Sequence, residues 1–62
     1  MQTKIIKIQL PNENFTFSQR EKLVNEKILK LIEEFKKQRL YTKQHEVLNR
    51  TVSFYSVRFT FN

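Results

Sequence analysis

One stretch of the chain has the periodicity of a long amphipathic helix, and a helix of that length dominates a protein of 62 residues. Apolar residues recur there at spacings of three and four, which places them on one face of a helix. The main stripe and its flanks are Val24, Ile28, Leu31, Phe35, Leu23 and Ile32. Charged residues take the opposite face: Lys22, Glu26, Lys30, Glu33 and Lys37. We therefore expect the core to form by covering this single apolar face.

The helix ends are marked by local signals. Ser18 stands three residues before Glu21, which matches a capping box and predicts a helix start at that point. The basic run at residues 36–39 suits the negative end of the helix dipole, and we place the helix end near Leu40. The chain has no glycine, so the usual left-handed cap residue is not available.

The segment before the helix has the composition and partial alternation of a strand. Residues 3–10, TKIIKIQL, are rich in β-branched side chains, and Pro11 then ends the ladder because it has no N–H to donate. One predicted face holds Ile6, Ile8 and Leu10, and the other holds Thr3, Ile5, Lys7 and Gln9. We expect the first set to face the helix.

The segment TVSFYSVRFTFN, residues 51–62, alternates more clearly. Its apolar face contains Tyr55, Val57, Phe59 and Phe61, and its polar face contains Ser56, Arg58, Thr60 and Asn62. Val52 and Phe54 have the opposite phase, and this break predicts a β-bulge near Phe54 and Tyr55.

Residues 41–50, YTKQHEVLNR, are ambiguous. They fit a strand around His45 to Leu48 with Asn49-Arg50 as a tight turn, but also a longer helix, a second short helix or a loop. The strand is slightly favoured. The predicted fold is one α+β domain over residues 1–62, of order β-α-β or β-α-β-β, with one long helix on a small, mainly antiparallel sheet.

The residue types argue against an enzyme. There is no aspartate, no cysteine and one histidine, so neither a Ser-His-Asp triad nor a cysteine or histidine metal cluster is possible. Without glycine there is no phosphate-cradling loop, and we expect no cofactor and no metal. His45 beside Glu46 is better explained as a solvated pair. The absence of cysteine fits a reducing cytosol, and no apolar run is long enough to span a membrane, so we expect a cytoplasmic protein.

The positive charge lies mostly in one half of the chain. Residues 1–35 contain six Lys/Arg and five Glu, a net charge of +1, whereas residues 36–62 contain six Lys/Arg and one Glu, a net charge of +5. Lysine and arginine among neutral hydrogen-bonding residues are typical of phosphate-binding surfaces. The candidate nucleic-acid-binding residues are Lys7, Lys36, Lys37, Arg39, Lys43, Arg50 and Arg58. Arg58 is the predicted centre of a binding face on the polar side of the last strand, with Lys7 beside it.

Two function classes fit these features. The first is a small basic accessory protein that binds DNA or RNA. The second is a protein-binding regulator or inhibitor that contacts an acidic surface or adds its C-terminal strand edge to a partner. The same edge predicts a homodimer, since pairing would enlarge a small core. Abundant Lys, Phe, Ile and Asn indicate an AT-rich genome, and with the small size they suggest a phage or another mobile element.

Overall fold

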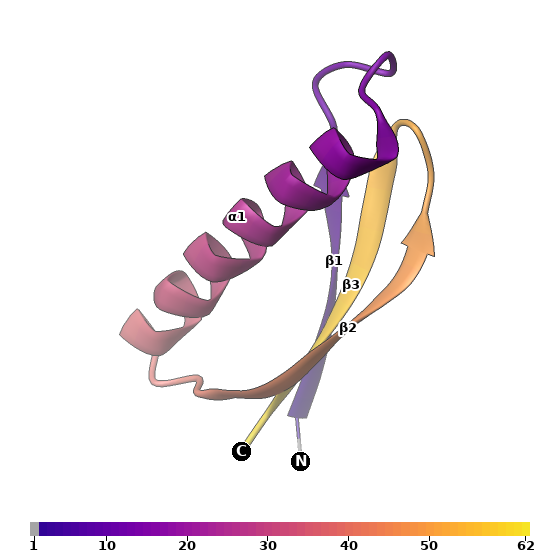
Figure 1. Cartoon of the computed structure of the whole chain (residues 1–62). Helices are drawn as coiled ribbons and strands as arrows, with labels where there is room; N and C mark the ends of the chain where they lie inside the picture. The colour runs from indigo at the N-terminus through magenta and orange to yellow at the C-terminus, as the bar shows by residue number, and fades with distance from the viewer. Residues whose placement is uncertain (1) are drawn as a thin grey trace.

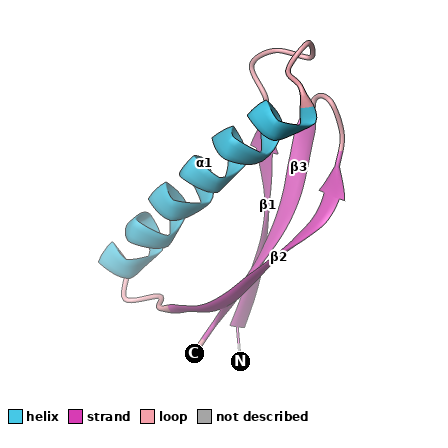
Figure 2. Cartoon of the chain, viewed as in Figure 1, coloured by secondary structure: helices cyan, strands magenta, loops and turns pink. Residues whose placement is uncertain are grey.

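The computed structural model describes residues 2–62 and has the order strand, helix, strand, strand (Figure 1). The elements are β1 (Gln2–Gln9), α1 (Phe17–Lys37), β2 (Thr42–Arg50) and β3 (Phe54–Phe61). The three strands form one antiparallel sheet in the order β1-β3-β2, and α1 lies diagonally across one of its faces (Figure 2). The predicted α+β fold is confirmed in its β-α-β-β form, and residues 41–50 belong to a strand.

The C-terminal strand β3 is the centre of the sheet. Its pairing with β1 runs unbroken from Gln2↔Phe61 to Gln9↔Phe54, and β2 pairs with it on the other side. The prediction of a free edge on this strand is therefore wrong. The helix covers β3, and buried backbone N–H and C=O groups need hydrogen-bond partners. A neighbouring strand on each edge of β3 supplies them. The sheet edges belong to β1 and β2.

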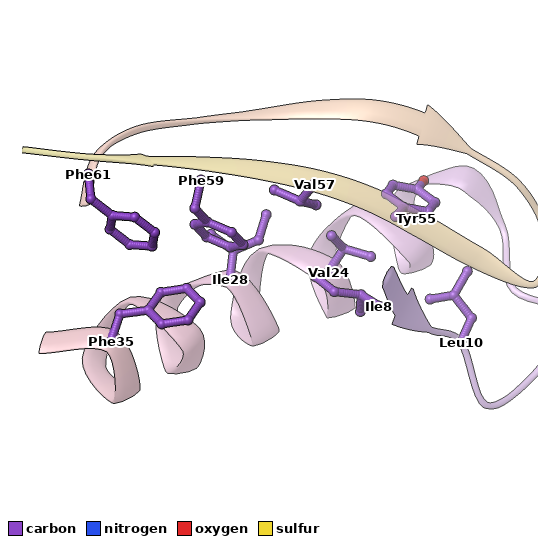
Figure 3. Packing of buried hydrophobic residues seen from close by; sticks show 9 residues of the cluster. All are labelled: Ile8, Leu10, Val24, Ile28, Phe35, Tyr55, Val57, Phe59 and Phe61. Atoms are coloured by element: carbon purple, nitrogen blue, oxygen red, sulfur yellow. The ribbon is translucent and has the colours of Figure 1, made fainter. Parts of the chain in front are cut away.

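The core forms between the apolar face of β3 and the predicted stripe of α1 (Figure 3). The β3 side chains Tyr55, Val57, Phe59 and Phe61 are at most 1% exposed. Phe35 places its ring edge-on against Phe59 and Phe61, with centroid distances of 5.2 and 5.0 Å. The predicted core faces of α1, β1 and β3 are confirmed. The buried cluster is completed by Ile8, Leu10, Val24 and Ile28.

The predicted bulge in the last strand is wrong. Val52 lies in the turn between β2 and β3, and Phe54, the first residue of β3, pairs with Gln9 in an unbroken register and points away from α1, so β3 contains no extra residue. Thr51 closes this turn, because its Oγ1 accepts the backbone N–H groups of Ser53 and Phe54 at 3.2 and 2.9 Å. The predicted Asn49-Arg50 turn is also wrong, since β2 continues to Arg50. The register shifts occur in β2, between Thr42 and Gln44 and between Val47 and Asn49.

The helix begins two residues earlier than the sequence predicted. Thr16 is the N-cap, and a complete capping box joins it to Gln19: Gln19 N donates to Thr16 Oγ1 at 3.2 Å, and Thr16 N donates to Gln19 Oε1 at 2.9 Å. The pair Thr16 and Gln19 has the same spacing as Ser18 and Glu21. The earlier start extends α1, and it leaves Glu21 free to accept a hydrogen bond from Arg50 Nε at 3.2 Å.

Thr16→Ala should therefore lower the free energy of unfolding by about 1 kcal/mol, because one helix N–H loses its acceptor. Ser18→Ala is the matched control and should change stability by less than about 0.5 kcal/mol. Urea unfolding of both variants measures the difference. A larger decrease for Ser18→Ala than for Thr16→Ala would contradict the observed cap.

The helix ends in a Schellman motif with arginine in place of glycine. Arg39 has a left-handed backbone with φ 63°, the one positive φ in the described residues. Leu40 N donates to Phe35 O and Arg39 N donates to Lys36 O, both at 2.9 Å, which is the paired pattern of this motif. Leu40 then packs against the core. The helix ends at Lys37 with Gln38 as its cap, slightly before the predicted end near Leu40.

Arg39→Gly should raise the free energy of unfolding by about 1 kcal/mol, because glycine adopts a left-handed backbone without the Cβ clash. The control Lys30→Gly places glycine at an exposed position within the helix, where it should destabilise by about 0.5–1 kcal/mol. Thermal and urea unfolding measure both changes. Destabilisation by Arg39→Gly would show that the arginine side chain stabilises the helix end more than its backbone strains it.

Candidate nucleic-acid interface

The structure separates the predicted basic residues into three places. Lys7 and Arg58 lie on the face of the sheet that α1 leaves uncovered, called here the open face. Arg50 lies at the end of β2, near the start of α1 (Figure 1). The remaining four lie at the opposite end of the molecule, where α1 leads into β2: Lys36, Lys37, Arg39 and Lys43. The seven predicted residues therefore do not form one continuous surface.

Strand register defines the open face. The β3 residues that alternate with the core residues, Phe54, Ser56, Arg58 and Thr60, point away from α1 because side chains alternate along a strand, although Thr60 is itself buried at 6% exposure. Their β1 partners are Gln9, Lys7, Ile5 and Thr3, in the same order. The face is polar as predicted, although it also holds Ile5, which is 64% exposed, and the half-buried Phe54.

Both cations of the open face already have local contacts. The Arg58 guanidinium donates to Glu46 Oε2 at 2.8 Å, and these two residues are cross-strand partners. Lys7 Nζ lies 4.4 Å from the centroid of the Phe54 ring, within the range of a cation–π contact. Glu46 offsets the charge of the predicted central arginine. The sequence missed this pair because it depends on the register of a strand with two irregularities.

Arg50 is also paired. Its Nε lies 3.2 Å from Glu21 Oε1, and its guanidinium carbon lies 5.9 Å from the centroid of the buried Tyr55 ring. These contacts place Arg50 on the helix side of the sheet. It joins β2 to the first part of α1 and is remote from the basic residues at the helix exit.

The helix exit forms the most cationic part of the described chain. We define the basic end as Lys4, Lys36, Lys37, Arg39 and Lys43 together with Tyr41. Lys4 joins this group from β1, with its Nζ 5.7 Å from the centroid of the Phe35 ring. The sequence prediction omitted Lys4. The alternation of β1 could have found it, because Lys4 has the same phase as Ile6 and Ile8 and therefore lies on the helix side.

The loop at the basic end has a defined backbone and an exposed aromatic ring. Tyr41 is 55% exposed and stands between Arg39 and Lys43 in the chain. Its carbonyl accepts the N–H of Asn62 at 3.2 Å, which ties the loop to the end of β3. Only Lys37 of the basic end has an ion pair within residues 2–62, at 3.5 Å to Glu34 Oε1, and both side chains of that pair are largely solvated.

The one histidine does not form a site with its neighbour. The His45 ring lies on the helix side, 6.2 Å from the centroid of Phe59, whereas Glu46 bonds to Arg58 on the open face. Successive strand residues point to opposite faces, so the two side chains diverge. The described part of the chain contains no group of three or more acidic or histidine side chains placed to hold a metal ion.

Within residues 2–62, the helix α1 is not apolar enough to cross a membrane.

No protein-family model matches this chain, and no characterised protein or solved structure matches it at a significant level.

The Arg58–Glu46 pair can be measured by a double-mutant cycle with Arg58→Gln and Glu46→Gln. Both side chains are solvated, so we expect a coupling energy of about 0.2–1 kcal/mol that falls as salt is added. Urea unfolding of the wild type, both single variants and the double variant gives this value. A coupling energy near zero at low salt would mean that Arg58 is free in solution and that Glu46 does not offset its charge.

Proposed function

We propose that this protein is a non-enzymatic nucleic-acid-binding accessory protein and that its contact surface is the basic end. The observation that supports this is the lack of carboxylate partners for four of its five cations, within residues 2–62. Those four are Lys4, Lys36, Arg39 and Lys43. Arginine and lysine side chains without an internal partner are available to phosphate oxygens, and each phosphate neutralised releases counterions.

Tyr41 favours single-stranded nucleic acid as the ligand. An exposed aromatic ring among cations offers a base a stacking surface, and stacking does not require a particular sequence. Duplex DNA keeps its bases stacked on one another and gives such a ring little to contact. The proposed mechanism is therefore phosphate binding by the basic end with a base stacked on Tyr41.

The cellular setting is part of the same proposal. A chain with a net charge of +6 is attracted to polyanions over distances longer than direct contact, which favours encounter with nucleic acid in the cytoplasm. The amino-acid composition, rich in residues with A/T-rich codons, supports a phage or other mobile element as its origin. The protein-binding regulator remains the second candidate, and the free edge of β1 is the observation that favours it.

Fluorescence anisotropy with a labelled oligothymidine, repeated over a range of salt concentrations, tests the proposal. Lys36→Gln with Lys43→Gln should weaken binding and flatten the slope of log affinity against log salt by about 0.7 for each phosphate of the single strand that the variant no longer neutralises. The matched control is Lys22→Gln with Lys27→Gln, which removes the same charge from exposed positions in the earlier part of α1. Equal affinity for the two double variants would overturn the proposal.

Tyr41→Ala separates stacking from charge. It should weaken single-strand binding by about 1–3 kcal/mol, leave the salt dependence unchanged, and have little effect on duplex binding. Arg58→Gln is the comparison for the open face and should change neither single-strand affinity nor duplex affinity. If Arg58→Gln weakens binding and the variants of the basic end do not, the open face is the interface.

A further inference from the structure

The two edges of the sheet differ in their readiness to accept another strand. The edge strand β2 has register shifts at two places, and such irregularities twist an edge and interrupt its row of backbone groups. The other edge strand, β1, keeps a regular register over its full length from Gln2 to Gln9. β1 is thus the edge with a regular row of free backbone groups.

The direction of those groups follows from one hydrogen bond. Leu10 N donates to Ser53 O at 2.8 Å, so the backbone of Leu10 points toward β3. Backbone groups alternate in direction along an antiparallel strand, so the residues at odd positions of β1 point outward. The N–H and C=O groups of Ile5, Lys7 and Gln9 therefore face away from the sheet.

A groove of about 360 Å³ runs between this edge and α1. Its apolar lining comes from Ile6 and Ile8 of β1 and Leu31 of α1, and two cations of the helix, Lys27 and Lys30, also line it. No ion pair joins either lysine to a carboxylate within residues 2–62. An extended chain placed beside β1 would pair with the outward backbone groups of β1. It would also contact the apolar side chains of the groove and lie near the positive charge of Lys27 and Lys30.

We propose that the outer edge of β1 binds an extended acidic segment of a partner protein, which adds to the sheet as a fourth strand. Main-chain hydrogen bonds supply affinity in this mode, and the side chains that face the groove supply selectivity. Acidic residues of the ligand pair with Lys27 and Lys30, and small apolar residues contact Leu31. This site is separate from the basic end, so its existence does not depend on nucleic-acid binding.

The charge of the groove disfavours a second copy of this chain as the occupant. Pairing of two β1 strands across a two-fold axis would bring both helices to the same face of a joined sheet. Lys27 and Lys30 of each copy would then flank the same junction, where like charges repel. An acidic partner removes this repulsion, and a second copy doubles it.

The test uses the full chain and a blocked peptide of about eight residues, the length of a typical strand. Threonine occupies the odd positions of the peptide, and valine and glutamate alternate at the even positions, which face the groove. Binding should slow amide hydrogen exchange at Ile5, Lys7 and Gln9 and leave the inward amides of β1 unchanged. A peptide with lysine in place of glutamate should not bind. Equal binding of the two peptides would overturn the proposal.

Two pairs of variants separate charge from backbone pairing. Lys27→Glu with Lys30→Glu should weaken peptide binding by about tenfold or more, whereas Lys22→Glu with Lys36→Glu, an equal change of charge outside the groove, should change it little. Lys7→Pro removes an outward N–H and should abolish binding, whereas Lys7→Thr keeps that N–H and should retain most of it. If Lys7→Pro prevents folding, the charge-reversal pair alone decides.

Three results would contradict the proposal. One is equal peptide affinity in both charge-reversal variants. Another is slowed exchange at Ile5, Lys7 and Gln9 on adding oligothymidine in place of the peptide, which would assign the edge to nucleic acid. The third is slowed exchange at these amides as the concentration of the protein alone rises, together with dimer formation in sedimentation, which would assign the edge to self-association.

Discussion

The packing of Phe35 against Phe59 and Phe61 sets the arrangement of the whole molecule. These three rings meet edge-on at the helix exit, and the smaller apolar residues of α1 and β3 continue the contact toward the start of the helix (Figure 3). β3 supplies most of the buried surface on the sheet side, and it is therefore enclosed by the helix on one face and by a strand on each edge. The single helix also leaves one face of a three-stranded sheet in contact with solvent.

This arrangement explains the distribution of paired and unpaired charge. The six glutamates of the chain lie mostly in or near α1, and only Glu46 lies in the sheet. Glu21 and Glu46 reach arginines of the neighbouring strands, and Glu34 reaches Lys37 within the helix. The cations at the helix exit lie beyond most of the carboxylates, so positive charge accumulates there. Of the net charge of +5 in residues 36–62, +4 thus lies at one end of the molecule, on Lys36, Lys37, Arg39 and Lys43.

The two edge strands differ in how their unpaired backbone groups are protected from pairing with another chain. β2 is irregular, and its side chains are mostly exposed and polar or charged, which is typical of an edge that resists pairing. β1 is regular and carries Lys4 and Lys7 within an apolar strand, and each lysine lies over an aromatic ring. Edge lysines discourage the approach of another positively charged chain but not of an acidic one. The proposed acidic ligand at β1 and the proposed phosphate ligand at the basic end therefore follow from the same excess of positive charge at two separate surfaces.

Periodicity in the sequence determined the features that depend on neighbours along the chain. The apolar stripe from Val24 to Phe35, the inward Ile8 and Leu10, and the alternation from Tyr55 to Phe61 were all predicted, because each follows from the geometry of a helix or a strand. The tertiary structure alone decided the central position of β3, the register that joins Glu46 to Arg58, and the outward direction of the β1 edge, since strand pairing joins residues far apart in the sequence. It also chose Thr16 over Ser18 as the cap. Both residues satisfy the same local pattern, and in the folded chain Thr16 and Gln19 form the capping box while Glu21 pairs with Arg50 of a distant strand.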